Sequence, residues 1–185
     1  LVTHAGTDKA RNGGRIYLGI LLGTSIAFFL LALIITYIVS GTLDFRAGGI
    51  LPATLSPTAV AVLYGLFLFG VGKAALMPFH RWLPAAMVAP TPVSALLHAV
   101  AVVKAGVFSV LKITVYVFGI ESLQQGQASQ WMLYVAGATV LLASLIAMTK
   151  DNLKARLAYS TVSQLAYIVL GAALAHQLGI IGGAM

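Results

Sequence analysis

The stretch "LFLFGVGKAALMPFHRWL", residues 66–83, places Lys73 inside an almost wholly apolar run, five residues before Pro78. A charged side chain beside a helix-breaking proline is unfavourable in a soluble core and costlier in a membrane. Insertion scales put the cost of a lysine at the centre of a membrane helix at about 2.5–3.5 kcal/mol. Lys73 and Pro78 therefore indicate a local structure that tolerates a cation.

The overall composition is that of a membrane protein. Of 185 residues, 60% are hydrophobic and 8% are charged, and the mean hydropathy is +0.99. Soluble domains carry about 25% charged residues, so this chain lacks the polar groups to cover a soluble surface. Its net charge of +7 lies mainly in short segments beside apolar runs. That pattern is typical of membrane topology, and we expect no nucleic-acid partner.

Five apolar segments have about the 20 residues that a membrane-spanning helix needs. We expect an all-α, polytopic membrane bundle of about five transmembrane helices, because helices satisfy their own backbone in lipid. One of them should be broken near Pro78. The expected spans are 16–40, 57–89 with the break, 91–118, 131–149 and 157–178. All belong to one membrane domain, and we expect the chain, which begins with Leu1, to be a piece of a longer protein.

The connecting segments predict the orientation in the membrane. Residues 1–15 and 150–156 are both basic, and four expected spans separate them. An even number of crossings returns the chain to the same side, and positive charge favours the cytoplasm. We therefore expect the cell inner (plasma) membrane, with both of these segments cytoplasmic.

Lys73, His98 and Lys104 are the candidates for a proton pathway. Ionisable groups inside membrane helices usually face a water-filled path or a partner. All four acidic residues of the chain lie in segments that we expect to be connecting loops, so no carboxylate lies inside an expected span. A lysine removed from water loses its proton unless something stabilises the cation. Groups that exchange protons near neutral pH are what a proton relay requires.

Simpler interpretations of these residues stay open. Lys73 could extend to the membrane surface, although Lys104 lies too near the middle of its span for this to be favourable. His98 could be a neutral histidine hydrogen-bonded to a neighbouring helix. Thr91 and Ser94 share one helical face with His98 and could support it. Lys104 lies about 9 Å further along the axis and about 120° around it, a separation that a water chain could join.

"FHRWLP", residues 79–84, groups His80, Arg81 and Trp82 next to Pro78. Interrupted helices at membrane depth occur where they are buried in protein or line a cavity. The three residues could anchor the helix at the membrane surface, where Trp and Arg are frequent, or could gate the path. In either case we expect them to support the break.

Two stretches resemble the antiporter-like, proton-conducting subunits shared by Mrp-type multi-subunit cation/proton antiporters and respiratory complex I. They are "GKAALMPFHRWLPAAMVAPTPVSALLHAVAVVKAGVF" (72–108) and "KDNLKARLAYSTVSQLAYIVLG" (150–171), about a third of the chain. The resemblance implies about fourteen helices with two inverted repeats of about five helices, each containing a broken helix. Lys73 matches the lysine of the first broken helix, and His98 and Lys104 match the polar positions of the next helix. The glutamate partner of Lys73 would lie upstream of Leu1, and a second lysine beyond Met185.

We therefore expect a proton-translocating membrane subunit of a multi-subunit cation/proton antiporter. The alternative is the antiporter-like subunit of a redox-driven pump, of the NADH-quinone oxidoreductase or membrane-bound hydrogenase type. A purely structural scaffold would need neither lysine. The expected partners are other membrane subunits, the lipid bilayer, protons and Na+ or K+. The chain has no cysteine, no histidine pair at ligand spacing and no glycine fingerprint after a strand, so we expect no catalytic residue, no cofactor, no metal site and no redox chemistry of its own.

Overall fold

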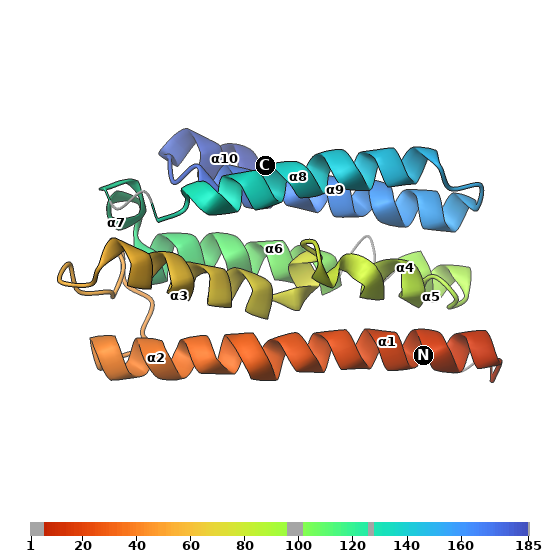
Figure 1. Cartoon of the computed structure of the whole chain (residues 1–185), viewed down its shortest axis with the longest axis horizontal. Helices are drawn as coiled ribbons and strands as arrows, with labels where there is room; N and C mark the ends of the chain where they lie inside the picture. The colour runs from red at the N-terminus through yellow and green to blue at the C-terminus, as the bar shows by residue number, and fades with distance from the viewer. Residues whose placement is uncertain (1–5, 96–101, 126–127, 185) are drawn as a thin grey trace.

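A computed structural model of the chain describes residues 6–95, 102–125 and 128–184. Within these ranges the regular structure is entirely helical, which confirms the all-α prediction. The helices run along one long axis in three layers (Figure 1). α1 and α2 form the first layer, α3 to α6 the second, and α8, α9 and α10 the third.

The elements are helices that follow one another along the chain, and one of these helices is broken after Gly70. The first helix consists of α1 (Asp8–Thr24), the π-helical segment η1 (Ser25–Leu30) and α2 (Leu31–Ser40). The broken helix consists of α3 (Pro57–Gly70), the short turns η2 (Gly72–Ala74) and η3 (Phe79–Arg81), and α4 (Trp82–Ala86). After it come α5 (Thr91–Ala95), α6 (Val102–Ile113), the π-helical segment η5 (Thr114–Phe118), α7 (Ile120–Gln125), α8 (Gln130–Met148), α9 (Leu153–Ala173) and α10 (Gln177–Ala184).

Polar side chains mark where three of these helices begin. Thr7, Ser56 and Asn152 each accept a backbone N–H of the first turn, at 3.2, 3.3 and 2.9 Å. Such caps satisfy donors that a helix leaves unpaired. Asn152 caps α9, and this helix starts at Leu153 and ends at Ala173. Ala175 then adopts a left-handed backbone (φ 50°), and the chain turns into α10.

The expected break starts before Pro78. α3 ends at Gly70, and Val71 leaves the helical conformation (φ −77°, ψ 63°) seven residues before the proline. Ala75 then takes a left-handed backbone, with φ 54°. Glycine is about 1 kcal/mol less favourable than alanine in a helix, and glycines flank Val71 on both sides. The helix therefore ends in the sequence "GVG", and Pro78 lies within the interruption rather than at its start.

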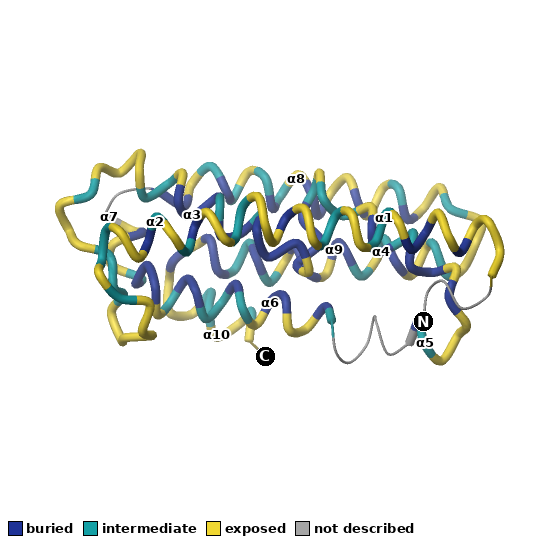
Figure 2. The backbone as a smooth tube through the Cα atoms, turned by 90° about the horizontal axis from the view of Figure 1, so that it is seen from below, coloured by how far each residue is buried: buried dark blue, intermediate teal, exposed yellow. Residues whose placement is uncertain are grey.

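Buried residues lie between the layers, and the outer faces are exposed (Figure 2). Tyr64 and Phe67 of α3 pack edge-to-face on Phe118, with ring centroids 5.1 and 5.7 Å away. The outer faces are nevertheless apolar: Ile38 is 75% exposed and Tyr134 is 79% exposed. Apolar surface on this scale indicates contact with lipid or with other subunits.

Two helices in the described ranges are long and apolar enough to cross a membrane. They are Asp8–Ser40 and Gln130–Met148, while Pro57–Gly70 is apolar but shorter. Only 11% of the most apolar part of Asp8–Ser40 is buried, whereas the core helix of a soluble protein is mostly buried. The number of five spans stays a prediction.

Candidate functional site

Lys73 lies in the middle of the interruption, in the single turn η2 just beyond the end of α3. The C-terminal end of a helix carries unpaired carbonyl groups and a partial negative charge. A cation near such an end gains about 0.3–1 kcal/mol. The end of α3 at the break thus helps to stabilise the positive charge of Lys73, for which the sequence showed no partner.

Trp82 fixes the backbone next to Lys73. The indole Nε1–H donates a hydrogen bond of 2.9 Å to the carbonyl oxygen of Gly72. Trp82 is fully buried, and its ring meets the edge of Tyr17 on α1 at a centroid distance of 5.6 Å. A tryptophan buried inside the protein is not an anchor at the membrane surface. Trp82 instead ties α4 and α1 to the turn that carries the lysine.

Two close backbone approaches hold the same turn from its sides. A Cβ atom on Gly72 would collide with Oγ1 of Thr24, the last residue of α1. On the other side, a Cβ atom on Gly106 of α6 would lie 2.6 Å from the carbonyl carbon of Lys73. Real Cβ atoms do not approach this closely, so a side chain at either position would force its neighbour to move. The turn is therefore clamped between the first helix and α6.

Lys73 itself lines a cavity. The cavity has a volume of about 220 Å³ and is bounded by residues of η1, α6 and the break: Ser25, Phe29, Gly70, Val71, Gly72, Lys73 and Ser109. The lysine is exposed in this chain, and its ammonium group makes no hydrogen bond or ion pair with any described residue. A helix break that lines a cavity is the arrangement in which such breaks are tolerated at membrane depth.

Lys104 lies on α6, two residues before the glycine that contacts the Lys73 backbone. α6 therefore brings the second candidate lysine to the same level of the bundle as the break. Lys104 is exposed in this chain. His98 lies outside the described residues, so its relation to the two lysines stays a prediction.

The other expected support residues have separate surroundings. The ring of His80 lies 5.8 Å from the ring of Tyr159 on α9. Arg81 and Thr91 are exposed. Ser94 is buried, and its hydroxyl donates to the backbone carbonyl five residues earlier, at 3.0 Å. This bond gives Ser94 a local structural role at the start of its helix.

The described part of the chain places no carboxylate oxygen within 4.0 Å of the ammonium group of Lys73 or Lys104. Its one ion pair within 4.0 Å joins Arg11 to Asp8 on the exposed start of α1. Within the described ranges, neither Lys73 nor Lys104 is paired with an acidic residue. The expectation that the counter-charge lies elsewhere in a longer protein stays a prediction.

The sequence reasoning missed four residues of the site: Thr24, Ser25, Gly106 and Ser109. Small polar residues and glycine are common in membrane helices because helices pack closely there, so nothing in the local sequence sets Gly106 and Ser109 apart. A signal does exist for Thr24 and Ser25, because their hydroxyls interrupt an otherwise apolar run.

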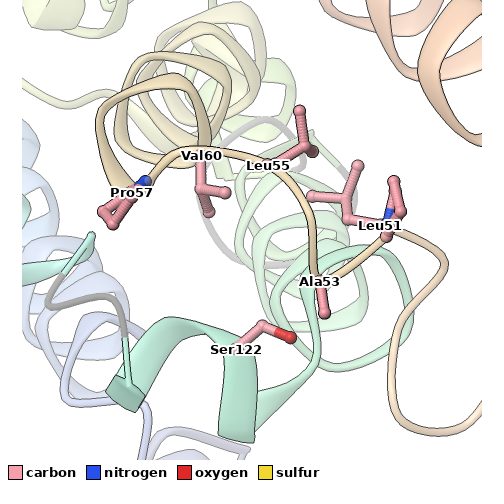
Figure 3. Close-up of a pocket in the computed structure, with 7 residues that line it drawn as sticks. Leu51, Ala53, Leu55, Pro57, Val60 and Ser122 are labelled. Carbon is pink, nitrogen blue, oxygen red and sulfur yellow. The ribbon is translucent and has the colours of Figure 1, made fainter.

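A second cavity, of about 280 Å³, lies between the loop that leads into α3 and the segment that carries Ser122 on α7 (Figure 3). All but one of its lining residues have apolar side chains: Leu51, Pro52, Ala53, Leu55, Pro57, Val60 and Ser122. Ser122 contributes the single hydroxyl group of this lining, and no lining residue is ionisable. This cavity is therefore not a candidate for proton transfer.

One protein family has a model that matches the whole chain, residues 1–185, and its description is "NADH:quinone oxidoreductase/Mrp antiporter, TM". The chain belongs to this family. The resemblance seen in residues 72–108 and 150–171 is thereby confirmed, and the chain is a membrane protein of the antiporter-like family.

Curated relatives in this family are quinone oxidoreductase subunits. The chloroplastic NAD(P)H-quinone oxidoreductase subunit 5 of Adiantum capillus-veneris is 43% identical over 116 residues, 62% of this chain and 15% of that protein. NADH-ubiquinone oxidoreductase chain 5 of Metridium senile is 38% identical over 151 residues, 80% of this chain and 24% of that protein. The chain thus spans about a fifth of the length of these relatives.

Two solved structures share the fold. A chain of the Mrp complex from Dietzia sp. DQ12-45-1b matches with a TM-score of 0.80 and 28% identity, over 98% of this chain and 20% of that chain. A chain of the membrane-bound sulfane sulfur reductase, an archaeal respiratory membrane complex, matches with a TM-score of 0.81 and 29% identity. That match covers 100% of this chain and 37% of the other. The fold of the family therefore occurs in an Mrp complex and in a respiratory complex.

Proposed function

We propose that this chain forms the proton-translocating part of an antiporter-like membrane subunit. The observation that carries the proposal is Lys73: an ammonium group without a partner in the described chain, on a helix break that lines a cavity. A lysine in such surroundings can switch its charge when a carboxylate approaches or withdraws. Protons would pass from Lys73 to His98 and Lys104, with Pro78 and Trp82 keeping the break in shape.

The subunit would work within a larger membrane assembly, together with other membrane subunits. We favour a cation/proton antiporter that couples protons to Na+ or K+, and the likeness to a chain of an Mrp complex supports this. The second candidate is a redox-driven pump, supported by the quinone oxidoreductase relatives and the likeness to a respiratory complex. Both candidates use the same proton step. Transport driven by a cation gradient, measured without a quinone or other electron acceptor, would separate them.

We also propose five membrane spans within an inverted-repeat fold of the plasma membrane, with residues 1–15 and 150–156 cytoplasmic. In Figure 1 the start of α1 and the connection between α8 and α9 lie at the same end of the bundle, in keeping with this topology. Labelling from outside intact cells should reach a cysteine placed at Gln125 but not one placed at Asn152. Labelling of the second alone, or of both equally, would contradict the topology.

The proposed role of Lys73 is tested by Lys73→Arg and Lys73→Ala in the full-length subunit. Arginine keeps the charge but does not release its proton in proteins. Both variants should assemble, yet lose most proton flux, with a fall of about 100-fold or more, the usual worth of a general acid–base group. The measurement is proton flux in reconstituted vesicles, normalised to the amount of assembled complex.

Lys112→Arg is the matched control for these variants. Lys112 lies near the end of α6, and its ammonium group lies 4.4 Å from the ring centroid of Phe45 in a loop. Arginine can make the same contact with a ring, so this variant should conduct like the wild type. Wild-type flux from Lys73→Arg would show that Lys73 merely reaches the membrane surface, and the relay role would be wrong.

A further inference from the structure

The cavity beside Lys73 contains two hydroxyl groups that come from different helices. Ser25 begins the π-helical segment η1, and Ser109 lies on α6, 84 residues further along the chain. The other lining residues are Phe29 and the segment Gly70, Val71 and Gly72 at the break. The polar side chains of this cavity are therefore the lysine and the two serines.

Both hydroxyl groups have free hydrogen-bonding capacity. A serine hydroxyl has one donor and two acceptor lone pairs. The Ser109 hydroxyl donates to the carbonyl oxygen of Ala105 at 2.8 Å, which leaves its lone pairs free. Ser25 makes no side-chain hydrogen bond with the residues that the structure describes. Each hydroxyl can thus accept a hydrogen bond from a molecule in the cavity.

The backbone holds these groups in place. α3 packs against η1, and Gly72 approaches Thr24, the neighbour of Ser25, so closely that it admits no side chain. Gly106, three residues before Ser109, contacts the Lys73 backbone in the same way. π-Helical segments are rare and are frequently found at functional sites. The backbone that carries the three polar side chains is therefore held in place by close packing.

We propose that Ser25, Ser109 and Lys73 form a water-binding site in which the lysine exchanges its proton. The inference rests on the proposed function of Lys73 and adds the acceptor of the proton and its ligands. A bound water needs two to four polar partners and occupies about 30 Å³ in the liquid, so a cavity of about 220 Å³ has room for several. An N–H bond of the ammonium group breaks, and the proton joins a lone pair of the water oxygen. The products are a neutral amine and a hydronium ion, which the serine oxygens stabilise by accepting its hydrogen bonds.

Cysteine accessibility tests whether the site holds water. This chain contains no cysteine, so Ser25→Cys, Ser109→Cys and Ile26→Cys in the full-length complex each add one thiol to this region. Ile26 is the matched control, because it adjoins Ser25 and is exposed as Ser25 is, but does not line the cavity. The probe is methanethiosulfonate ethylammonium, which reacts with thiolates, and thiols in apolar surroundings stay protonated. Both serine positions should react about tenfold faster than position 26, as a difference of about one pKa unit in the thiols would give. Equal rates at all three positions would overturn the inference.

Proton flux tests whether the hydroxyls take part. Ser25→Val and Ser109→Val should each lower the flux per assembled complex about tenfold, in line with the loss of one hydrogen-bond acceptor. Ser25→Thr keeps the hydroxyl and should conduct like the wild type. Ser160→Val is the control for a serine-to-valine change, because Ser160 is exposed on α9 and does not line the cavity.

The outcomes separate this inference from the proposed function. If Lys73→Arg abolishes flux while Ser25→Val and Ser109→Val conduct normally, the water site is wrong and the role of Lys73 stands. If Lys73→Arg conducts normally, the role of Lys73 is wrong and the inference falls with it. Fast labelling together with low flux in both valine variants supports the whole assignment.

Discussion

Polar side chains in apolar surroundings are hydrogen-bonded to one another in the α8–α9 hairpin, whereas those at the break between α3 and α4 line a cavity. In the hairpin, the hydroxyl oxygens of Ser144 and Ser163 lie 2.9 Å apart, and Ser163 also donates to the carbonyl oxygen of Val140 at 3.2 Å. The two helices continue unbroken for 19 and 21 residues. At the break, Lys73 and Ser25 have no such partner among the described residues and line a cavity instead.

The comparison shows how a polar group is used in each region. Where polar groups pair with one another, they stabilise helix contacts, and the backbone needs no special support. At the break the side chains are left free, and the structure stabilises the backbone: Trp82 binds the Gly72 carbonyl, and Gly106 packs on the turn. A fixed backbone with free polar side chains is the arrangement that preorganises a functional site.

Among the variants that test this contrast, Trp82→Ala should have the largest effect, a loss of assembled complex. It removes a fully buried aromatic side chain and the hydrogen bond to Gly72, and large-to-small changes of this kind cost about 3–5 kcal/mol. We expect a large loss of assembled complex before any change in ion selectivity. Complex yield and transport by the remaining complex are the two measurements.

Trp82→Phe sharpens the same test, because it keeps an aromatic ring and removes only the N–H donor. It should lower thermal stability by about 1 kcal/mol, the net worth of one hydrogen bond. Normal assembly of Trp82→Ala with complete loss of transport would instead place this residue in the proton path.

Gly106→Ala should have the next largest effect. The added Cβ would lie 2.6 Å from the Lys73 carbonyl carbon and 2.8 Å from the Lys73 Cβ. Since the backbone must shift, we expect a loss of about 1–3 kcal/mol in stability together with a fall in flux per complex.

Gly137→Ala on α8 is the matched control for this change. Its Cβ would meet only the Leu170 Cδ1 atom, at 3.8 Å, which is an ordinary contact. Alanine in a helix should leave stability unchanged or raise it by up to about 1 kcal/mol, with normal flux. Equal behaviour of the two variants would show that the contact between α6 and the break does not hold the site.

Ser144→Ala should have the smallest effect. Hydrogen bonds between membrane helices average about 0.6 kcal/mol, and Ser163 keeps its bond to Val140 in this variant. Thermal unfolding of the purified complex should therefore change little, and flux per complex should be that of the wild type. A marked fall in flux would remove the contrast between the hairpin and the break.

The sequence by itself determined the class of protein, the all-helical fold and the family. These follow from composition, from apolar segments of about 20 residues and from two motifs around Lys73 and Lys154. It also identified Lys73, because a lysine in an apolar run is costly wherever it lies. Such features depend on residue type and local spacing, which the sequence contains completely.

Only the tertiary structure decided where the helix breaks, what holds the break and which groups share its cavity. The break starts at Val71, which glycines flank, rather than at Pro78, and Thr24 and Gly106 pack closely against the turn that follows. Ser25 and Ser109 meet Lys73 from helices far apart in the chain. Contacts of this kind depend on how three helices pack, and the energy of a close backbone approach has no counterpart in the local sequence.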